Sequence, residues 1–527
     1  MLLNMGRLLK QNTLRFHDRL ALVNVERNRR YTYRQMDDIS NRICNMMKLK
    51  FGLKRNDFYV TILANDNMAL FYPWMLKSQF GGVWIDVRET LVDKLSHIDF
   101  TGPKVIFLEE NLLDELYESL KERGLIIISM DRPVKSHHEV HYFWDLLAET
   151  SVQSVEIDLP ADDTARHICF LRFTSGTSGK SKCAMYSLNN IWLWSWNPVH
   201  YVEIMPYELP KVLLFSPIHH AASASAVLPV ILKGGCIITL NKAGVDEIGD
   251  TIAKEKIDMI YAVPTVLYRI IEKQLHLKYD LSSLKTIRYG AAPISPPKLE
   301  RLLEIFGQIL VQTYGSTECW PSCTILSPKD HQVSNEKEIR RLSSVGRPFP
   351  GQEIIVRDDQ ERPVANGCYG ELWIRGVNTI CGYYNAPELT KENFSSDGFW
   401  KSGDIGYIDD EGYVYIVDRK KDMIISGGYN VYASEVENCL NKHEHVQNSA
   451  VFGIPDETWG EAVCAVVVLT KGRDVHPKDL IDHCKKNLTH YKVPKKLFIR
   501  DTLPLNSAGK VLRRVLRDQF IKEEDRC

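Results

Sequence analysis

Residues 170–185 read Phe170-Leu-Arg-Phe-Thr-Ser-Gly-Thr-Ser-Gly-Lys-Ser-Lys-Cys-Ala-Met185, in which an apolar, strand-like lead-in runs into hydroxyl groups, glycines and two lysines. Glycines let the backbone turn tightly and expose its N–H groups, while hydroxyls add donors and lysines add positive charge. The segment therefore predicts a loop that binds a polyphosphate, with a polar surface turn as the alternative. It is not a P-loop, because that motif requires glycine five residues before its Gly-Lys pair, and Thr174 stands there.

The composition is that of a large protein with balanced charge. Its 527 residues predict roughly three or four domain-sized units. The 66 Lys and Arg residues nearly cancel the 67 Asp and Glu residues, so we expect no binding to nucleic acid or to an anionic membrane surface. The 12 cysteines are scattered without a Cys-x-x-Cys pair, which is typical of reduced thiols. No signal peptide or membrane-length apolar run is present, and we expect a cytoplasmic protein without a transmembrane segment.

The order of strand-like and helix-like patterns predicts an α/β fold. Residues 1–160 and 161–340 each alternate buried strand patterns with amphipathic helix patterns, which predicts two doubly wound parallel sheets. From about residue 341 to residue 418 the pattern changes to short strands separated by Gly, Pro and Asp turns, which predicts a small, distorted β-barrel. The remaining residues, 419–527, read as a compact α+β unit.

Several strand patterns in residues 161–340 end in small or polar residues. The three clearest ends are Val263-Pro264-Thr265, Gly290-Ala-Ala-Pro293 and Tyr314-Gly-Ser-Thr-Glu318. In open α/β sheets, ligands bind beyond the carboxyl ends of the strands. These ends therefore predict one ligand-binding cleft.

Five segments occur in a fixed order along the chain. They are Thr174-Ser-Gly-Thr-Ser-Gly-Lys-Ser-Lys182, Tyr314-Gly-Ser-Thr-Glu318, Gly370-Glu-Leu-Trp-Ile-Arg-Gly376, Ser402-Gly-Asp404 with Asp418-Arg-Lys-Lys-Asp422, and Asn506-Ser-Ala-Gly-Lys510. In this order they resemble the motifs of the adenylate-forming superfamily, which contains acyl-CoA synthetases, adenylation domains and firefly-type luciferases. The resemblance covers most of the chain. It implies an N-terminal AMP-binding domain of residues 1–418 and a smaller, mobile C-terminal domain of residues 419–527.

The resemblance also implies a reaction and its cosubstrates. Such enzymes transfer a carboxylate onto the α-phosphorus of ATP, release pyrophosphate, and then let a thiol such as that of CoA displace AMP. Thr317 would contact the α-phosphate and Glu318 would bind Mg²⁺, whose preferred ligands are hard oxygens. Asp404 would bind the ribose hydroxyls, with Arg419 nearby. The other nucleotide-binding positions implied are Thr174, Ser175, Gly176, Thr177, Ser178, Gly179, Lys182, Gly290, Ala291, Ala292, Pro293, Tyr314, Gly315 and Ile416.

Three of these assignments have simpler alternatives. Glu318 is equally the carboxylate expected at the start of a helix, where it satisfies free N–H groups. Gly403-Asp404 reads as an ordinary turn without the family context. Lys510 reads as a solvated lysine near a chain end, whereas the resemblance implies that it bridges the carboxylate and the α-phosphate.

The C-terminal segments imply a second half-reaction. Lys421 matches the hinge position of the family. Rotation there would withdraw Lys510 and bring Ser426, Gly427 and Gly428 to the channel that admits the pantetheine arm of CoA.

The chain departs from the family pattern at several positions. Ser181 and Cys183 replace the usual Pro and Gly, and Leu188 or Asn189 replaces a histidine that often follows the loop. Tyr429 replaces an acidic or polar residue. Because the hydroxyls and Lys182 are retained, we expect activity.

The segment His219-His220-Ala221-Ala222 narrows the class of carboxylic acid that the enzyme is expected to activate. Relatives that activate amino acids carry an aspartate there, so an acid without an α-amino group is expected, either fatty or aryl. His220 is a candidate catalytic residue that lines or gates the acyl pocket, with a packed histidine as the alternative. The leading hypothesis is an acyl-CoA ligase. An enzyme that loads an acyl carrier protein and a non-catalytic nucleotide-binding homologue are the alternatives, and the oligomeric state is not predicted.

Overall fold

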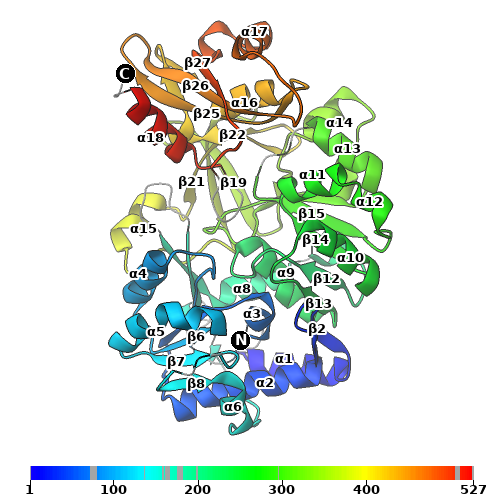
Figure 1. Ribbon diagram of the computed structural model, residues 1–527, viewed down its shortest axis with the longest axis vertical. Coiled ribbons are helices and arrows are strands. Elements are labelled where there is room, and N and C mark those ends of the chain that lie inside the picture. The colour runs from blue at the N-terminus through cyan, green and yellow to red at the C-terminus, as the bar shows by residue number, and fades with distance from the viewer. Residues whose placement is uncertain are drawn as a thin grey trace.

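Strands and helices alternate along most of the chain and build two large sheets. The computed structural model describes residues 2–71, 77, 80–133, 135, 137–156, 159–160, 166–174, 182–197, 200–292, 294, 296–504 and 511–524. Figure 1 shows the two large sheets with their helices in the lower and right-hand parts of the molecule, and the C-terminal unit at the top.

The first large sheet is parallel except at one edge. Its strand order in the described residues is β11-β10-β5-β4-β6-β7-β8, and only β10 and β11 are antiparallel neighbours. The strands are β4 (Phe58–Ile62), β5 (Gly81–Trp84), β6 (Val105–Leu108), β7 (Ile126–Ser129), β8 (Val140–Tyr142), β10 (Ile168–Phe173) and β11 (Cys183–Ser187).

The second large sheet has a parallel centre and antiparallel edges. Its order is β18-β17-β16-β15-β14-β12-β13-β2-β3, and the strands from β16 to β2 are parallel. The strands are β2 (Leu20–Asn24), β3 (Arg29–Thr32), β12 (Lys211–Leu214), β13 (Cys236–Thr239), β14 (Met259–Ala262), β15 (Thr286–Gly290), β16 (Leu310–Tyr314), β17 (Thr324–Leu326) and β18 (Arg347–Pro348). The predicted α/β fold with parallel sheets is confirmed.

The two sheets exchange strands along the sequence. β2 and β3 come from the first 32 residues and yet belong to the second sheet, beside β13. β10 and β11, in turn, follow residue 160 and join the first sheet beside β5. Another short pair, β1 (Leu2–Leu3) with β9 (Leu159–Pro160), links the start of the chain to the same junction. Each sheet therefore depends on both α/β segments of the sequence.

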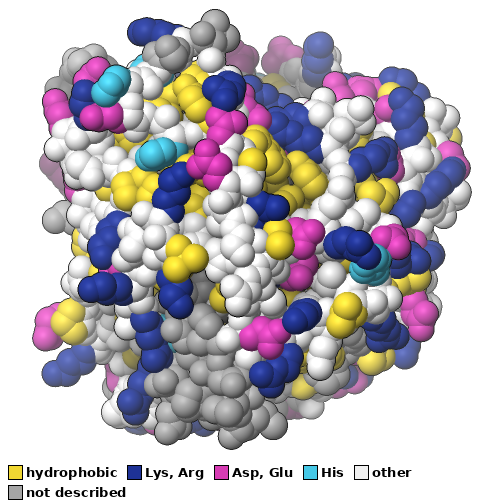
Figure 2. All heavy atoms as spheres, turned by 90° about the horizontal axis from the view of Figure 1, so that it is seen from below, with side chains coloured by type: hydrophobic (Ala, Val, Ile, Leu, Met, Phe, Trp, Pro, Cys, Tyr) yellow, Lys and Arg dark blue, Asp and Glu magenta, His cyan; other side chains and the backbone are white. Residues whose placement is uncertain are grey.

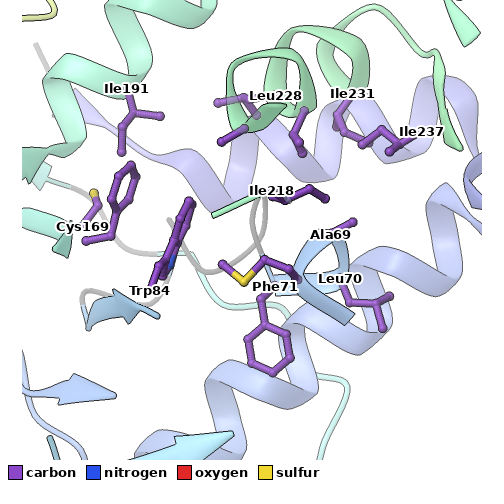
Figure 3. Packing of buried hydrophobic residues seen from close by; sticks show 14 of the residues in the cluster. Ala69, Leu70, Phe71, Trp84, Cys169, Ile191, Ile218, Leu228, Ile231 and Ile237 are labelled. Atoms are coloured by element: carbon purple, nitrogen blue, oxygen red, sulfur yellow. The ribbon is translucent and has the colours of Figure 1, made fainter. Parts of the chain in front are cut away.

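Helices cover both faces of each sheet. Between the two sheets lies a large apolar core, part of which Figure 3 shows with Trp84, Ile218 and Leu228 among its labelled members. The helices of these two layers are α1 (Met5–Phe16), α2 (Tyr33–Asn45), α3 (Asn65–Phe71), α4 (Leu91–Thr101), α5 (Leu113–Glu122), α6 (Phe143–Ala148), α8 (Leu188–Ser195), α9 (Ala221–Leu232), α10 (Val245–Glu255), α11 (Pro264–Glu272), α12 (Leu275–Lys278) and α13 (Pro296–Phe306). The short α14 (Glu336–Arg341) and α15 (Pro387–Asn393) follow.

The predicted β-barrel is wrong, because the β-rich unit is an open sheet. Its strands are β19 (Gln352–Arg357), β20 (Gly370–Gly376), β21 (Trp400–Ile408) and β22 (Val414–Arg419). They are antiparallel in that order, and within the described residues the outer strands β19 and β22 do not pair. Cys319 and Cys323, which follow β16, pack on the apolar face of this sheet. Since that face is already covered by another part of the chain, the sheet does not need to close on itself.

The C-terminal unit is a sheet with helices on both faces. Its elements are β23 (Ile424–Ser426), β24 (Tyr429–Val431), α16 (Ala433–Asn441), β25 (Val446–Asp456), β26 (Gly460–Leu469), α17 (Pro477–Asn487), β27 (Lys496–Ile499) and α18 (Arg513–Glu524). Side chains of β25 alternate between two cores, with Val451 on the α16 side and Phe452 on the α18 side. The Lys298 ammonium of α13 donates to the Gln447 carbonyl at 3.4 Å, which places this unit against the second large sheet's helices.

Arg513 connects the start of α18 to two other parts of the C-terminal unit. Its guanidinium donates to both carboxylate oxygens of the buried Glu437 at 2.9 and 2.7 Å and lies 3.1 Å from Asp422. Pro504 and Leu512, which flank residues 505–510, are joined by a 2.9 Å backbone hydrogen bond. The chain on either side of the predicted Lys510 motif is thus fixed to residues that adjoin Lys421.

Two properties of the structure bear on the predictions that the chain has no transmembrane segment and that its surface charge is balanced. Among the described residues, no helix combines the length and the apolar character needed to cross a membrane. On the face shown in Figure 2, Lys and Arg side chains are spread among Asp, Glu and hydrophobic side chains, in agreement with the balanced composition.

His331 is expected to make stability depend on pH. The ring is fully buried, with Nδ1 2.7 Å from the Ser327 carbonyl oxygen and Nε2 2.9 Å from the Tyr289 hydroxyl, and burial lowers its pKa to about 4. An unfolded histidine has a pKa of about 6.5. Below that pH the unfolded chain binds a proton that the folded chain does not bind, so the free energy of unfolding falls as pH drops from about 6.5 towards 4.

The test compares the wild type with His331→Gln by urea unfolding at pH 7 and pH 5. We expect the wild type to lose about 2 kcal/mol more than the variant between these two conditions. The matched control is His138→Gln, since the His138 side chain is 83% exposed and this variant should lose as much as the wild type. An equal loss in all three proteins would contradict the prediction.

Candidate active site

β10 and β11 hold the two ends of the predicted phosphate loop together. The Thr174 N–H donates to the Lys182 carbonyl at 2.8 Å, and Phe173 pairs with Cys183 in the antiparallel ladder. The Cys183 side chain, which stands where the family usually has glycine, is buried in the core beneath α4. Several predicted residues lie outside the described part of the chain, so phosphate binding by this loop stays a prediction. They are Ser175, Gly176, Thr177, Ser178, Gly179 and Ser181.

Lys182 and Glu318 are brought to opposite sides of one tyrosine. The Lys182 ammonium lies 5.1 Å from the centre of the Tyr383 ring and donates to the Asn393 amide oxygen at 2.9 Å. The Tyr383 hydroxyl donates to Glu318 Oε1 at 2.9 Å, and the Ser316 hydroxyl donates to Oε2 at 3.1 Å. Two motifs that are about 140 residues apart therefore contact the same tyrosine.

Glu318 is held in a buried position with hard oxygen atoms around it. Each carboxylate oxygen accepts one hydrogen bond and keeps a second lone pair, because an ionised carboxylate offers about four acceptor positions. Thr317, the neighbouring residue, is fixed through its carbonyl oxygen, which accepts from the Tyr186 hydroxyl. A buried carboxylate beside hydroxyl groups is a donor set that fits Mg²⁺ together with phosphate oxygens.

Asp404 joins three strands. Its side chain is almost fully buried on β21 and accepts a hydrogen bond from the Tyr314 hydroxyl at the end of β16. The Arg419 guanidinium, at the end of β22, lies 2.6 Å from the other carboxylate oxygen. Ile416 lies on β22 as well, where it pairs with Gly406 and packs partly buried in the core of the small sheet. The structure thus gathers Tyr314, Asp404, Ile416 and Arg419 at one junction between the sheets.

The strand end at Gly290 is closely packed and strained. A Cβ atom at Gly290 would lie 2.2 Å from the Thr313 carbonyl oxygen, and one at Gly315 would lie 2.5 Å from Ser322 Cα, so neither position admits a side chain. Ala291 has a φ of +65°, a left-handed conformation that is costly for alanine. Such strain often marks a functional site. Ala292 is half-buried beside it, and Pro293 lies outside the described residues.

His220 belongs to a charged cluster that the sequence did not reveal. The residue caps α9, and its Nε2 lies 3.1 Å from the Arg88 guanidinium and 3.4 Å from Asp86. The buried His219 lies 2.7 Å from the same Asp86 oxygen, and Arg88 contacts both oxygens of Asp86. Burial would raise the pKa of Asp86, but His219, His220 and Arg88 outweigh it and hold that pKa far below its usual value.

The cluster corrects the expectation that no carboxylate lies near His219 and His220. The sequence segment lacks a carboxylate, but Asp86 is brought there from the end of β5 in the other large sheet. Its charge is already matched by Arg88, and burial lowers the pKa of His219 to about 4, so that ring is neutral near pH 7. With Arg88 on both oxygens, Asp86 is poorly placed to pair a substrate ammonium group.

The C-terminal candidates occupy a separate sheet. The Gly427 N–H donates to the Trp459 carbonyl at 2.8 Å, and Ser426 pairs with Gly460, so the hydrogen bonds found here are with neighbours in the same unit and not with Glu318 or Asp404. Gly428 follows in the turn to β24, and the Tyr429 ring stacks on Tyr491 at 4.6 Å. Lys421 is exposed in a short turn after β22, and partial desolvation lowers its pKa. Lys510 lies outside the described residues.

The sequence analysis missed three residues of the candidate active site, namely Asp86, Arg88 and Tyr383. Asp86 follows a buried strand directly, and a polar residue at a parallel strand's carboxyl end is a recognisable signal. No comparable pattern marks Tyr383, which lies in an irregular segment between β20 and α15.

Comparisons with known proteins identify the class. The family model for AMP-binding enzymes matches residues 9–384, and the model for the C-terminal domain of AMP-binding enzymes matches residues 435–510. Because the first match spans more than half of the sequence, the chain belongs to the AMP-binding enzyme family, within the adenylate-forming superfamily.

Individual relatives agree with that assignment over most of their length. A long-chain-fatty-acid–CoA ligase of Yersinia pestis is 28% identical over 97% of this chain and 93% of its own. A feruloyl-CoA synthase of an Amycolatopsis species is 36% identical over 69% of this chain and 72% of its own. ATP-bound MatB from Rhodopseudomonas palustris is 26% identical, covers 98% of this chain and 99% of its own, and superposes with a TM-score of 0.87. The apo form of the same protein gives 0.76.

Proposed function

We propose that the chain is an ATP-dependent, AMP-forming acid–CoA ligase that makes an acyl-adenylate and then transfers the acyl group to the thiol of CoA. The observation that carries the proposal is that Lys182 and Glu318 both contact Tyr383, while Asp404 is paired with Arg419. Lys182 provides positive charge that can bind phosphates, and Asp404 provides a carboxylate that can bind the hydroxyls of a sugar. The CoA ligases among the relatives support the same reaction class.

The nucleotide would lie across the carboxyl ends of β15 and β16. Gly290, Ala291 and Ala292 would form one wall for the adenine, where the lack of side chains at Gly290 and Gly315 lets neighbouring backbone pack closely against the strand ends. Asp404 would accept hydrogen bonds from the ribose hydroxyls through lone pairs that Tyr314 and Arg419 leave available. Thr174 and Lys182, at the two ends of the phosphate loop, would direct that loop towards the β- and γ-phosphates.

Glu318 would hold Mg²⁺, which supplies neutralising charge to the phosphates when it is bound. Tyr383 and Ser316 orient the carboxylate by donating to it, and the Thr317 hydroxyl is free to face the α-phosphate because the carbonyl of that residue anchors its backbone. In the first half-reaction an oxygen of the substrate carboxylate bonds to the α-phosphorus, and the bond from that phosphorus to pyrophosphate breaks. Lys510 would stabilise the negative charge that accumulates between the two anions.

In the second half-reaction the CoA thiolate bonds to the acyl carbon and AMP leaves. We propose that the C-terminal domain, residues 419–527, rotates about Lys421 between the two steps and presents Ser426, Gly427 and Gly428 to the thiol channel. The ATP-bound and apo forms of one relative superpose on this chain with TM-scores of 0.87 and 0.76, so the two states of that relative differ in shape.

The acid is proposed to lack an α-amino group, because the carboxylate near His219 and His220 is already paired. His220 is 37% exposed on its side chain and stands at the start of α9, where it would border the acyl group. A relative that acts on long-chain fatty acids and one that makes feruloyl-CoA support fatty and aryl acids respectively.

Replacing Asp404 by asparagine is expected to reduce kcat/KM for ATP by about 10- to 100-fold, because hydrogen bonds to a charged group contribute about 1.5–3 kcal/mol. The measurement is ATP–pyrophosphate exchange at varied ATP. Asp410→Asn is the matched control, since Asp410 is exposed in the turn after the same strand. An unchanged dependence on ATP would favour the simpler reading of Gly403-Asp404 as a turn.

The proposed function is tested by incubating the protein with ATP, Mg²⁺, CoA and a panel of fatty, branched and aryl acids, followed by mass analysis of AMP and thioester products. Acyl-CoA together with AMP is the expected result. Acyl-adenylate without thioester would indicate another acceptor, such as an acyl carrier protein. No AMP with any acid would indicate a non-catalytic homologue.

A further inference from the structure

Arg288 is a buried cation whose partners are all neutral. It lies on β15 and is only 1% exposed. Its Nε donates to the Thr313 hydroxyl at 3.1 Å, and its two terminal nitrogens donate to the hydroxyls of Ser225 at 2.6 Å and Ser322 at 2.8 Å. Among the described residues, no carboxylate forms an ion pair with it. The ring of Tyr261, at 5.6 Å, completes its surroundings.

This arrangement is unusual for a charge in a protein interior, where charges are normally paired. The buried Lys77 follows the rule, since its ammonium lies 3.1 Å from the Asp37 carboxylate. Burial without an acidic partner lowers the pKa of Arg288 to about 10, which still leaves the guanidinium charged near pH 7. A neutral side chain would connect the same three hydroxyls without the cost of burying a charge. The charge itself therefore calls for a functional explanation.

The partners of Arg288 place it directly beneath the candidate active site. Thr313 immediately precedes Tyr314, whose hydroxyl contacts Asp404. Ser322 packs against Gly315, since a Cβ atom on that glycine would lie 2.5 Å from Ser322 Cα. Ser225 lies on α9, little more than one turn after the His220 cap. Arg288 and Gly290 are two residues apart on β15, so their Cα–Cβ directions share one face of the sheet.

The same region has small side chains and unused hydrogen-bond donors. The buried residues in the first half of α9 have small side chains, namely Ser223, Ala224, Ser225 and Ala226. Each terminal nitrogen of a guanidinium carries two N–H groups, and the Ser225 and Ser322 hydroxyls account for one on each. Each terminal nitrogen therefore keeps one N–H group without a hydrogen-bond partner among the described residues, and a guanidinium can bind a carboxylate through two N–H groups at once.

We propose that Arg288 binds a second anionic group on the acid substrate, so that the enzyme prefers dicarboxylic acids to monocarboxylic acids of the same length. One carboxylate is activated at the α-phosphorus, and the distal one pairs with Arg288 beneath the strand ends. This inference rests on the proposed acid–CoA ligase function and names the substrate class of that same site.

The experiment measures ATP–pyrophosphate exchange with matched pairs of acids. The pairs are propionate with malonate, butyrate with succinate, valerate with glutarate, hexanoate with adipate, and benzoate with terephthalate. We expect kcat/KM for at least one dicarboxylic acid to exceed that of its partner by about 100-fold or more, because a site built for a polar group rejects the analogue that lacks it. A wild-type preference for the monocarboxylic member of every pair would overturn the inference.

Variants separate substrate binding from structural support. Arg288→Met keeps the length and removes the charge, and we expect it to lower kcat/KM for the preferred dicarboxylic acid by about 100-fold while leaving the monocarboxylic acid within about threefold. Arg288→Lys keeps the charge but loses the paired N–H groups, so its kcat/KM for the dicarboxylic acid should lie between those of the wild type and Arg288→Met. Arg301→Met is the matched control, because Arg301 is exposed on α13 and, among the described residues, is paired with Glu304.

The possible failures are distinguishable. If Arg288→Met lowers exchange equally with both members of a pair while its thermal midpoint and ATP affinity stay those of the wild type, Arg288 has no role in selecting the acid. If Arg288→Met does not fold, the wild-type preference and Arg288→Lys still decide the question. Exchange with monocarboxylic acids alone contradicts only the role of Arg288, whereas silence of the wild type with every acid contradicts the ligase function itself.

Discussion

Replacing Lys510 by alanine is expected to slow adenylation by about 100- to 1,000-fold and to leave thioester formation from supplied acyl-adenylate within about threefold of the wild type. The reason is that Lys510 would act only where the carboxylate and the α-phosphate approach each other, and the second half-reaction lacks that pair of charges. ATP–pyrophosphate exchange measures the first step, and release of AMP from synthetic acyl-adenylate with CoA measures the second.

Lys471→Ala is the matched control for this experiment, because Lys471 is an exposed lysine of the same C-terminal unit. It should leave both rates unchanged. If Lys510→Ala slowed both half-reactions equally, the lysine would support the fold or the binding of substrates in both steps. An unchanged exchange rate would favour the interpretation of Lys510 as a solvated lysine.

Replacing Glu318 by glutamine should reduce the adenylation rate by about 100-fold and raise the Mg²⁺ concentration needed for half-maximal exchange. Glutamine has nearly the shape of glutamate and still accepts from the Tyr383 hydroxyl, which donates to Oε1 at 2.9 Å, so the site should keep its geometry and lose its charge. A neutral amide oxygen is a weaker ligand for a hard divalent cation than a carboxylate is. The measurement is pyrophosphate exchange at varied Mg²⁺ and saturating ATP.

The control is Glu336→Gln on α14, where the side chain is exposed in the first turn of the helix. It should retain the wild-type dependence on Mg²⁺. A Glu318→Gln protein with a lower thermal midpoint but an unaltered dependence on Mg²⁺ would show that Glu318 supports the local structure through the Tyr383 and Ser316 hydroxyls and does not bind the cation.

The motifs were predictable from sequence because each is a short, local pattern with a chemical purpose. Lys182, Glu318, Asp404 and Arg419 were all expected near a nucleotide, and the structure gathers Lys182 with Glu318, and Asp404 with Arg419. Parallel sheets were also predictable, since strand and helix patterns of the observed length permit few other arrangements. The roles of these residues stay predictions until the half-reactions are measured.

The features that could not be predicted from the sequence depend on contacts between distant segments of the chain. The strand exchange that places β2 in the second sheet and β10 in the first has no local signal. The barrel prediction failed for a related reason, because Cys319 and Cys323 cover a face that the β-rich segment alone would have to bury. Asp86 reaches His219 only through the packing of two sheets, and the isolation of Arg288 becomes visible only when its neighbours are known.

The contacts of Arg513 determine how the proposed conformational change would take place. This residue ties the start of α18 to Asp422, next to Lys421, and to Glu437 on α16, while Pro504 and Leu512 are joined across the Lys510 motif. Because the chain on both sides of residues 505–510 is anchored in the C-terminal unit, the proposed rotation would carry these flanks together with a body of about 100 residues. The exchange between half-reactions would then be a domain rotation, which takes on the order of microseconds to milliseconds, rather than the faster opening of a flexible loop.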